Sequence, residues 1–183
     1  MENKKLPDIL AENIVVKSRI FTVQGQKLQF PNGTQVDYER LVSHPDGAVL
    51  IVPMLDDDTL LLIREYSAGV GRYELGFPKG KIDPGETWLE ACERECIEEI
   101  GYKPLRIDYL DKVSLAAGYM DHHTHLVWVQ DLVPAQGEGD EPEPLEVVPW
   151  KLSDWPSLLH QPAFSEGRAY AALFLTLQKL GRI

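Results

Sequence analysis

The sequence predicts an α/β protein, an α/β/α sandwich whose mixed β-sheet lies between helices, with a small antiparallel β-sheet element at the N-terminus. Three observations support this fold class. Residues 14–42 alternate as antiparallel strands do, residues 48–63 contain two apolar strand segments, and a well-marked helix at residues 88–100 is followed by further strands. Strands that surround and follow a central helix are typical of a sheet covered by helices.

The N-terminal strands are predicted from alternation and from a turn signal. Apolar and polar residues alternate around Phe21–Val23 and Leu28–Phe30, and Pro31-Asn32-Gly33 supplies a hairpin turn. The chain then returns through a second strand at residues 36–41. We assign residues 1–45 to this element.

The main domain is assigned to residues 46–183 and begins with a pair of strands. Ala48–Val52 and Leu60–Ile63 are apolar, and they flank the acidic turn Asp56-Asp57-Asp58. Three consecutive aspartates resemble a metal site, but a solvated hairpin turn is the favoured interpretation.

The helix at residues 88–100 has marked ends. Thr87–Glu90 fits a capping box directly after the turn Asp83-Pro84-Gly85, and Gly101 suits the left-handed position past the end. At about 100° per residue, one narrow apolar stripe is predicted to face the core, formed by Leu89, Cys92, Cys96 and Ile100.

Further strands and one helix complete the domain. Ile107–Leu115 and Thr124–Val133 are predicted strands, residues 134–144 form an acidic loop, and Ser165 is the predicted cap of a C-terminal helix. This helix is expected to pack into the core through Tyr170, Leu173, Phe174 and Leu177.

Three glutamates of the first helix stand out. Glu95, Glu98 and Glu99 lie together beside the apolar stripe, and like charges at these spacings oppose the helix by roughly 0.2–0.5 kcal/mol per pair. Burial increases this cost, because each carboxylate also loses water. A hard cation with oxygen ligands removes the conflict, and Mg²⁺ is the usual choice beside phosphates. A solvated glutamate-rich helix is the simpler alternative for three glutamates taken alone.

A longer pattern favours the cation site. The residues Gly80, Glu86, Arg94, Glu95, Glu98, Glu99 and Gly101 match the Nudix box, G-x5-E-x7-R-E-U-x-E-E-x-G-U, where U is a bulky aliphatic residue. Cys96 and Tyr102 stand at the two U positions. The chain therefore resembles the Nudix family, and the similarity to bacterial ADP-compound hydrolases of that family covers nearly the whole chain, including 17–19, 38–40, 63–66, 73–77 and 139–145.

This resemblance implies an activity. Nudix enzymes hydrolyse nucleoside diphosphates linked to another group, using Mg²⁺ or Mn²⁺. We therefore expect Mg²⁺-dependent hydrolysis of the diphosphate bond in ADP-linked compounds such as ADP-ribose, diadenosine polyphosphates or NADH, with release of AMP. In the related ADP-ribose pyrophosphatases an N-terminal β-sheet is exchanged between the subunits of a dimer. The resemblance thus implies a homodimer in which residues 1–45 are swapped.

The resemblance also assigns the metal ligands. Glu95 and Glu99 are the expected side-chain ligands, with Glu98 beside them. In the family, a main-chain carbonyl at the start of the loop also reaches the metal, which implies Lys79 or Gly80 here.

The expected catalytic carboxylates are Glu98, Glu141 and Glu143. A carboxylate near the metal must take a proton from the attacking water. Related ADP-ribose hydrolases draw this base from the loop before the last strand, and Gly139–Glu143 is the matching stretch. A flexible, solvated acidic loop is the alternative for Glu141 and Glu143.

Four other charged residues receive supporting roles. Glu86 is expected to pair with Arg94 and orient the loop and helix, and a purely structural salt bridge is an equal alternative. Arg64 and Arg72 are the candidate substrate-binding cations, because an anionic substrate needs local positive charge.

Composition limits the kinds of molecule that this protein can be expected to bind. The net charge of −11 argues against general nucleic-acid binding. No apolar run approaches the roughly 20 residues needed to span a bilayer, and the N-terminus lacks the apolar core of a signal peptide. The two cysteines offer no secreted disulfide framework. We therefore expect a cytoplasmic protein that binds neither a membrane nor nucleic acid.

Several alternatives stay open. A nucleotide-binding Nudix regulator without catalysis is one, although such modules typically lose box glutamates. A hydrolase of another nucleoside diphosphate, such as a nucleotide sugar, is a second. Ala117 occupies a position where ADP-ribose-preferring relatives usually carry proline, so substrate preference is open. The run Met120–His125 fits a surface turn or a nucleotide-contacting loop better than a zinc site, because no cysteine partner accompanies its histidines.

Overall fold

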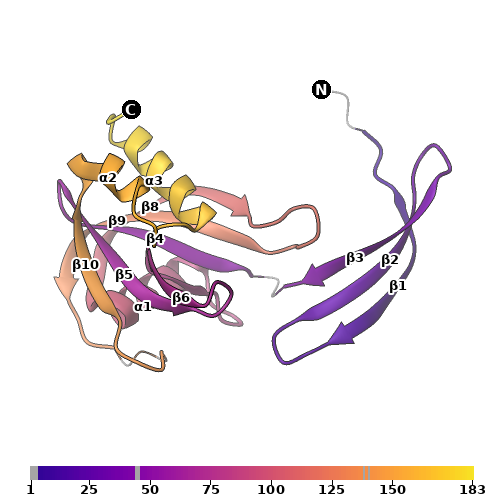
Figure 1. Ribbon diagram of the computed structural model, residues 1–183, viewed down its shortest axis with the longest axis horizontal. Helices are drawn as coiled ribbons and strands as arrows, with labels where there is room; N and C mark the ends of the chain where they lie inside the picture. The colour runs from indigo at the N-terminus through magenta and orange to yellow at the C-terminus, as the bar shows by residue number, and fades with distance from the viewer. Residues whose placement is uncertain (1–3, 44–45, 138, 140) are drawn as a thin grey trace. The chain divides into compact units, whose positions relative to one another are not determined.

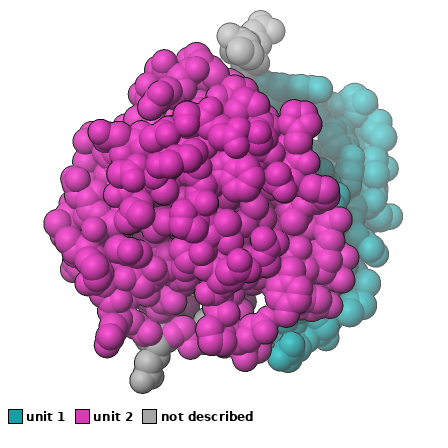
Figure 2. Space-filling view, turned by 60° about the vertical axis from the view of Figure 1, so that its left-hand side comes forward, with its two compact units in different colours: residues 1–45, 114–123 teal, residues 46–113, 124–183 magenta. Residues whose placement is uncertain are grey.

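The computed structural model describes two compact units, in residues 4–43, 46–137, 139 and 141–183. The first unit comprises Met1–Pro45 and Ser114–His123, and the second comprises Asp46–Val113 and Thr124–Ile183. Figure 2 shows the two units in different colours. Residues 114–123 thus belong to the first unit, although they follow residue 46 in the sequence.

The first unit is built around an antiparallel sheet in the order β1-β2-β3 (Figure 1). Its strands are β1 (Asp8–Lys17), β2 (Thr22–Gln29) and β3 (Gln35–Val42). The predicted hairpin between β2 and β3 is confirmed, because Phe30 and Thr34 close the turn with a backbone hydrogen bond of 2.9 Å. No residue of these strands is buried within the unit, and all of β1 is exposed.

Residues 114–123 add a turn to the edge of β3. The N–H of Leu41 donates to the carbonyl of Tyr119 at 2.8 Å, and Leu41 and Met120 form a parallel bridge. Arg40 pairs with Asp121 at 3.5 Å. These contacts explain why a stretch that interrupts the second unit packs with the first.

The second unit contains the larger, mixed sheet. Its strands are β4 (Ala48–Asp56), β5 (Thr59–Ser67), β6 (Arg72–Gly76), β7 (Lys79–Lys81), β8 (Tyr102–Ser114), β9 (His123–Pro134) and β10 (Glu146–Lys151). The order is β10-β5-β4-β9-β8, with β6 on β5 and β7 on β4. β4 runs parallel to β9 and antiparallel to β5. The turn between β4 and β5 is the predicted acidic turn, in which Asp56 accepts from Asp58 and Thr59.

Helices cover both faces of this sheet. Alternate residues of β4 point into two separate cores: Val49 and Ile51 pack under α1 (Trp88–Ile100), whereas Leu50 and Val52 pack under α3 (Gly167–Lys179). The short η1 (Leu152–Asp154) and α2 (Trp155–Leu159) lie on the α3 side, as Figure 1 shows. The predicted α/β/α sandwich with a mixed sheet is therefore confirmed.

Two details of the helices differ from the sequence prediction. The apolar stripe of α1 is shorter than expected: Cys92, Cys96 and Ile100 are buried, but Leu89 is 46% exposed. Leu89 lies in the first turn, before the helix reaches the sheet, and Ala91 is buried in that region instead.

The C-terminal helix also starts and packs differently. Its N-cap is Glu166, one residue later than predicted, and no side chain caps it. The Ser165 hydroxyl donates to Glu74 at 2.6 Å. Leu173 and Leu177 are buried as predicted. Phe174 is 56% exposed and lies on the outer side of the helix, and Tyr170 is 39% exposed. Of the helices in the described residues, none is long and apolar enough to cross a membrane.

Candidate active site

The register of α1 is fixed at both ends. The Thr87 hydroxyl accepts the N–H of Glu90 at 3.3 Å, and the Glu90 carboxylate accepts the N–H of Thr87 at 2.8 Å, so the predicted capping box is present. Gly101 ends the helix with φ 74°, in the left-handed region that favours glycine. Between these ends, Glu95 and Glu99 lie on the buried side, each 8% exposed.

The short strand β7 passes directly over this part of α1. Gly80, at its centre, pairs with Val49 of β4. A β-carbon added to Gly80 would lie 1.8 Å from Oε1 of Glu95. Only glycine permits so close an approach of the backbone to that carboxylate.

Arg94 contacts three of the box glutamates. Its Nε and Nη2 donate to the two oxygens of Glu86 at 2.9 and 3.0 Å, so the expected pair between these residues is present. Its Nη1 donates to Glu95 at 2.7 Å and to Glu98 at 2.9 Å, and Nη2 also reaches the carbonyl of Lys81 at 2.9 Å. The hydrogen bonds that Arg94 donates lower the pKa of Glu86, and the acceptor carboxylates, Glu86 first, raise the pKa of Arg94.

The pKa of Glu99 is raised, whereas that of Glu86 is lowered. Burial raises the pKa of Glu99 to about 8, and the nearby charge of Lys79 and a hydrogen bond from that residue only partly oppose the shift. The bond is donated by the main-chain N–H of Lys79 to Oε2 of Glu99 at 2.8 Å. Whether the main-chain carbonyl of Lys79 or Gly80 binds a metal stays a prediction.

A pocket of about 480 Å³ unites the box with the acidic loop. Its lining includes Glu95, Glu98, Glu99, Gly139, Glu141 and Glu143. The structure thus brings together the carboxylates from the helix and from the loop that the sequence marked as candidates. Glu143 accepts a hydrogen bond of 2.6 Å from the Tyr73 hydroxyl.

The carboxylates that line this pocket are oxygen ligands of the kind that divalent cations bind. As these side chains stand, no group of three or more His, Cys, Asp or Glu residues among the described residues is arranged to hold a metal ion. Glu95 and Glu99 are buried, and burial opposes ionisation of Glu99. A hard cation beside them would favour the ionised form and thereby relieve this cost.

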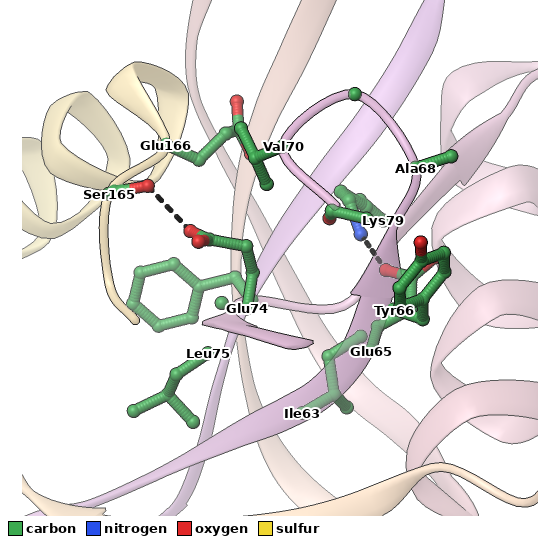
Figure 3. A pocket seen from close by; sticks show the side chains of 14 residues that line it. Ile63, Glu65, Tyr66, Ala68, Val70, Glu74, Leu75, Lys79, Ser165 and Glu166 are labelled. Atoms are coloured by element: carbon green, nitrogen blue, oxygen red, sulfur yellow. Dashed lines mark hydrogen bonds and ion pairs between the residues drawn. The ribbon is translucent and has the colours of Figure 1, made fainter. Parts of the chain in front are cut away.

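A second pocket has a volume of about 490 Å³ (Figure 3). β5, β6, the turn that joins them and the start of α3 form its walls, and its lining includes Ile63, Tyr66, Val70, Leu75 and Phe77. Two polar pairs face it: Lys79 Nζ binds Glu65, and Ser165 donates to Glu74. Burial opposes ionisation of Glu74, but bonds from Ser165 and Arg72 outweigh it and lower its pKa.

Lys79 lines the second pocket and bonds to a glutamate that lines the first. Its main chain holds Glu99, and its side chain binds Glu65 on β5. Neither Glu65 nor Glu74 is among the site residues predicted from the sequence. The position of Glu65 in the sequence could have marked it as a site residue. It follows the buried Ile63 by two residues, so both side chains lie on the same side of β5. A carboxylate on a buried side of a strand needs a polar partner.

The two predicted substrate-binding arginines lie elsewhere. Arg64 pairs with Glu146 at 2.9 Å, and Arg72 bonds to Glu74 and Ser165. Neither lines either pocket. Of the predicted histidine run, His125 packs against Trp88 and bonds to the Tyr109 hydroxyl at 3.0 Å.

Two family models match the chain. The NUDIX domain covers residues 44–173, and the NudE-type Nudix hydrolase N-terminal domain covers residues 7–40. Together they span the strands of the first unit and the sheet, box and loop of the second.

Individual relatives agree with these matches. The ADP compounds hydrolase NudE of Escherichia coli (strain K12) is 47% identical over 174 residues, which is 95% of this chain and 93% of that protein. An ADP-ribose pyrophosphatase of Bacillus subtilis (strain 168) is 25% identical over 93% of this chain and 95% of its own length. A crystal structure of an ADP compounds hydrolase superimposes with a TM-score of 0.92 at 45% identity, covering both chains fully. The chain therefore belongs to the Nudix hydrolase family, with an N-terminal domain of the NudE type.

Proposed function

We propose that this protein hydrolyses the diphosphate bond of ADP-linked compounds, such as ADP-ribose, diadenosine polyphosphates or NADH, and releases AMP. The observation that carries the proposal is the single pocket shared by Glu95, Glu98 and Glu99 of α1 and by Glu141 and Glu143 of the loop. The substrate class is supported by the relatives named an ADP compounds hydrolase and an ADP-ribose pyrophosphatase.

Mg²⁺ is the proposed cofactor, and Mn²⁺ is the alternative. Glu95, Glu98 and Glu99 would hold it, with the main chain at Lys79 or Gly80. When bound, such an ion neutralises phosphate oxygens and lowers the pKa of a coordinated water. Arg94, which now bonds to Glu95 and Glu98, orients both carboxylates for this role.

Side chains of the protein would carry out proton transfer and substrate binding. A loop carboxylate, Glu141 or Glu143, takes the proton of the attacking water. The apolar second pocket would receive part of the substrate beyond the diphosphate, because it adjoins the box through Lys79. Glu65 and Glu74, which line that pocket, supply acceptors for hydroxyl or amino groups.

The proposal includes a cytoplasmic homodimer that does not bind nucleic acid. The exposed apolar side chains of β1, such as Ile9, Ile14 and Val16, support a second copy that covers this sheet. Two free, buried cysteines support a reducing compartment. The net charge of −11 disfavours nucleic acid.

AMP release tests the proposal. Purified protein would be incubated with ADP-ribose, diadenosine triphosphate, NADH or an ADP-hexose, with Mg²⁺ and with EDTA. We expect Mg²⁺-dependent AMP from at least one compound, and a loss of kcat of ~10²-fold or more in Glu99→Gln. Binding without turnover would instead support a regulatory module, and the ranking of substrates would show whether Ala117 has changed the preference.

A further inference from the structure

Among its described residues, the acidic loop contacts the rest of the second unit on both sides of Glu141. On the N-terminal side, a β-carbon on Gly137 would come within 2.8 Å of Ile97 Cγ2, and one on Gly139 would come within 3.6 Å of the Glu98 carbonyl. The loop therefore lies directly on the end of α1 that carries the box glutamates. Glycine at position 137 allows this close contact.

On the C-terminal side, the loop is attached to the β5–β6 hairpin. Glu143 Oε1 accepts from the Tyr73 hydroxyl at 2.6 Å. Just past the loop, Arg64 Nε donates to Glu146, the first residue of β10, at 2.9 Å. Tyr73 is held in turn by Tyr66, its partner in the β5–β6 register, whose ring lies edge-on at 5.7 Å. The bond to Glu143 raises the pKa of Tyr73, so the hydroxyl keeps its proton and stays a donor.

The sequence between these attachments is stiff. Glu141 and Glu143 each precede a proline, Pro142 and Pro144. Proline fixes its own φ near −65° and keeps the preceding residue out of the helical region. Few backbone rotations therefore separate Glu143 from Glu141, so a contact that fixes Glu143 also limits where the Glu141 carboxylate can lie.

We propose that Tyr73 is a positioning residue for the general base, with Glu143 as its tether and Glu141 as the carboxylate that accepts the proton. This inference rests on the proposed hydrolase function. Both loop glutamates line the pocket that contains Glu95, Glu98 and Glu99, and Glu143 also bonds to Tyr73 on β6. Tyr73 thus acts on the reaction through two other residues.

The first test is steady-state kinetics of Tyr73→Phe. This change removes only the hydroxyl, so we expect kcat to fall about tenfold while KM changes less than about twofold, because a misplaced base affects the transition state and not substrate binding. Tyr109→Phe is the matched control, because it removes a hydroxyl that bonds to His125 at 3.0 Å. Its kcat should stay at the wild-type value.

A mutant cycle separates the two glutamates. Glu141→Gln should lower kcat by ~10²-fold or more, and Tyr73→Phe should add little to that loss. Glu143→Ala should resemble Tyr73→Phe, and the two changes together should cost no more than either alone. A far larger loss for Glu143→Ala than for Glu141→Gln would reverse the assignment and overturn the proposal.

Hydrogen–deuterium exchange measures the tether without relying on turnover. In Tyr73→Phe, the peptide that spans residues 139–148 should exchange several-fold faster, while peptides of α1 keep their wild-type rates. Unchanged exchange in that peptide would show that Tyr73 does not hold the loop. If the wild-type protein hydrolysed none of the test compounds, the proposed function would fail and the base assignment with it, whereas the exchange data would still decide the tether.

Discussion

Gly80 and Glu95 touch at a point where no side chain fits. The backbone of β7 and the Glu95 carboxylate are so close that a β-carbon at position 80 would overlap Oε1 at 1.8 Å. Because Arg94 holds the same oxygen at 2.7 Å, the carboxylate has little room to withdraw. The glycine of the box is therefore required by a contact that the sequence motif alone does not explain.

The Gly80→Ala change should consequently displace Glu95. We expect kcat/KM to fall by ~10²-fold, since a shift of about 1 Å at a catalytic group can have that effect. Gly167→Ala is the control, because a β-carbon there meets nothing within 4 Å, and it should leave activity unchanged. Wild-type kinetics in Gly80→Ala would show that Glu95 can move without consequence.

Arg94→Lys tests whether geometry or charge matters at the centre of the box. Lysine keeps the charge but cannot donate simultaneously to Glu86, Glu95 and Glu98 as the guanidinium does. We expect kcat/KM to fall ~10-fold or more, together with a lower Tm, measured by kinetics and scanning fluorimetry. The exposed Arg182 offers the same change as a control. Equal behaviour of the two variants would limit the role of Arg94 to its charge.

Glu99→Gln should change the pH dependence of stability in EDTA. Burial raises the folded-state pKa of Glu99 to about 8 from its ordinary value of 4.5, so folded Glu99 holds a proton that the unfolded chain loses between these values. The contribution of Glu99 to stability therefore falls as the pH rises from about 4.5 to 8. Glutamine is neutral throughout, so the Tm of the variant should exceed that of the wild type at pH 8, and the gap should narrow towards pH 5.

Glu93→Gln provides the comparison for that experiment. Glu93 lies on the same helix but pairs with Lys103 at 2.6 Å in a half-exposed position. We expect its Tm difference from wild type to stay small across this range. A gap for Glu99→Gln that does not vary with pH would mean that Glu99 is ionised in the folded protein.

If the proposed dimer forms, dimerisation should depend on the exposed apolar side chains of β1. Ile14 is 55% exposed within the described chain, and replacing it by glutamate places a charge on a surface that a second copy would cover. Ile14→Glu should elute as a monomer in size-exclusion chromatography with light scattering, while the wild type elutes as a dimer. The control Glu12→Gln, on the same strand, should remain dimeric. A monomeric wild type would contradict the proposal.

The sequence predicted those parts of the fold that depend on local signals. The capping box at Thr87, the hairpin at Gly33 and the apolar strands β4 and β5 all follow from neighbouring residues, and all are present. Leu89 and Phe174 were misplaced because periodicity shows which residues share a helix face but not where that helix leaves the sheet.

The site residues that belong to a sequence motif were predictable. Those that are brought to the site by tertiary contacts were not. The box glutamates were found from spacing. Two contacts join residues that are far apart in the chain: Ser165 with Glu74, and Tyr73 with Glu143. No spacing pattern in the sequence predicts such contacts. Ser165 is a suitable cap residue type, but the helix begins one residue later, and the Ser165 hydroxyl bonds to Glu74 and Arg72.

The first unit is assembled from two stretches of chain, because Leu41 of β3 bonds to Tyr119. During synthesis at ~5–20 residues per second, residues 1–45 leave the ribosome several seconds before residues 114–123. The first unit therefore cannot be completed until residues 46–113 of the second unit have also been synthesised. A nascent chain stalled before residue 114 would be expected to leave the backbone of β3 at Leu41 without its partner Tyr119.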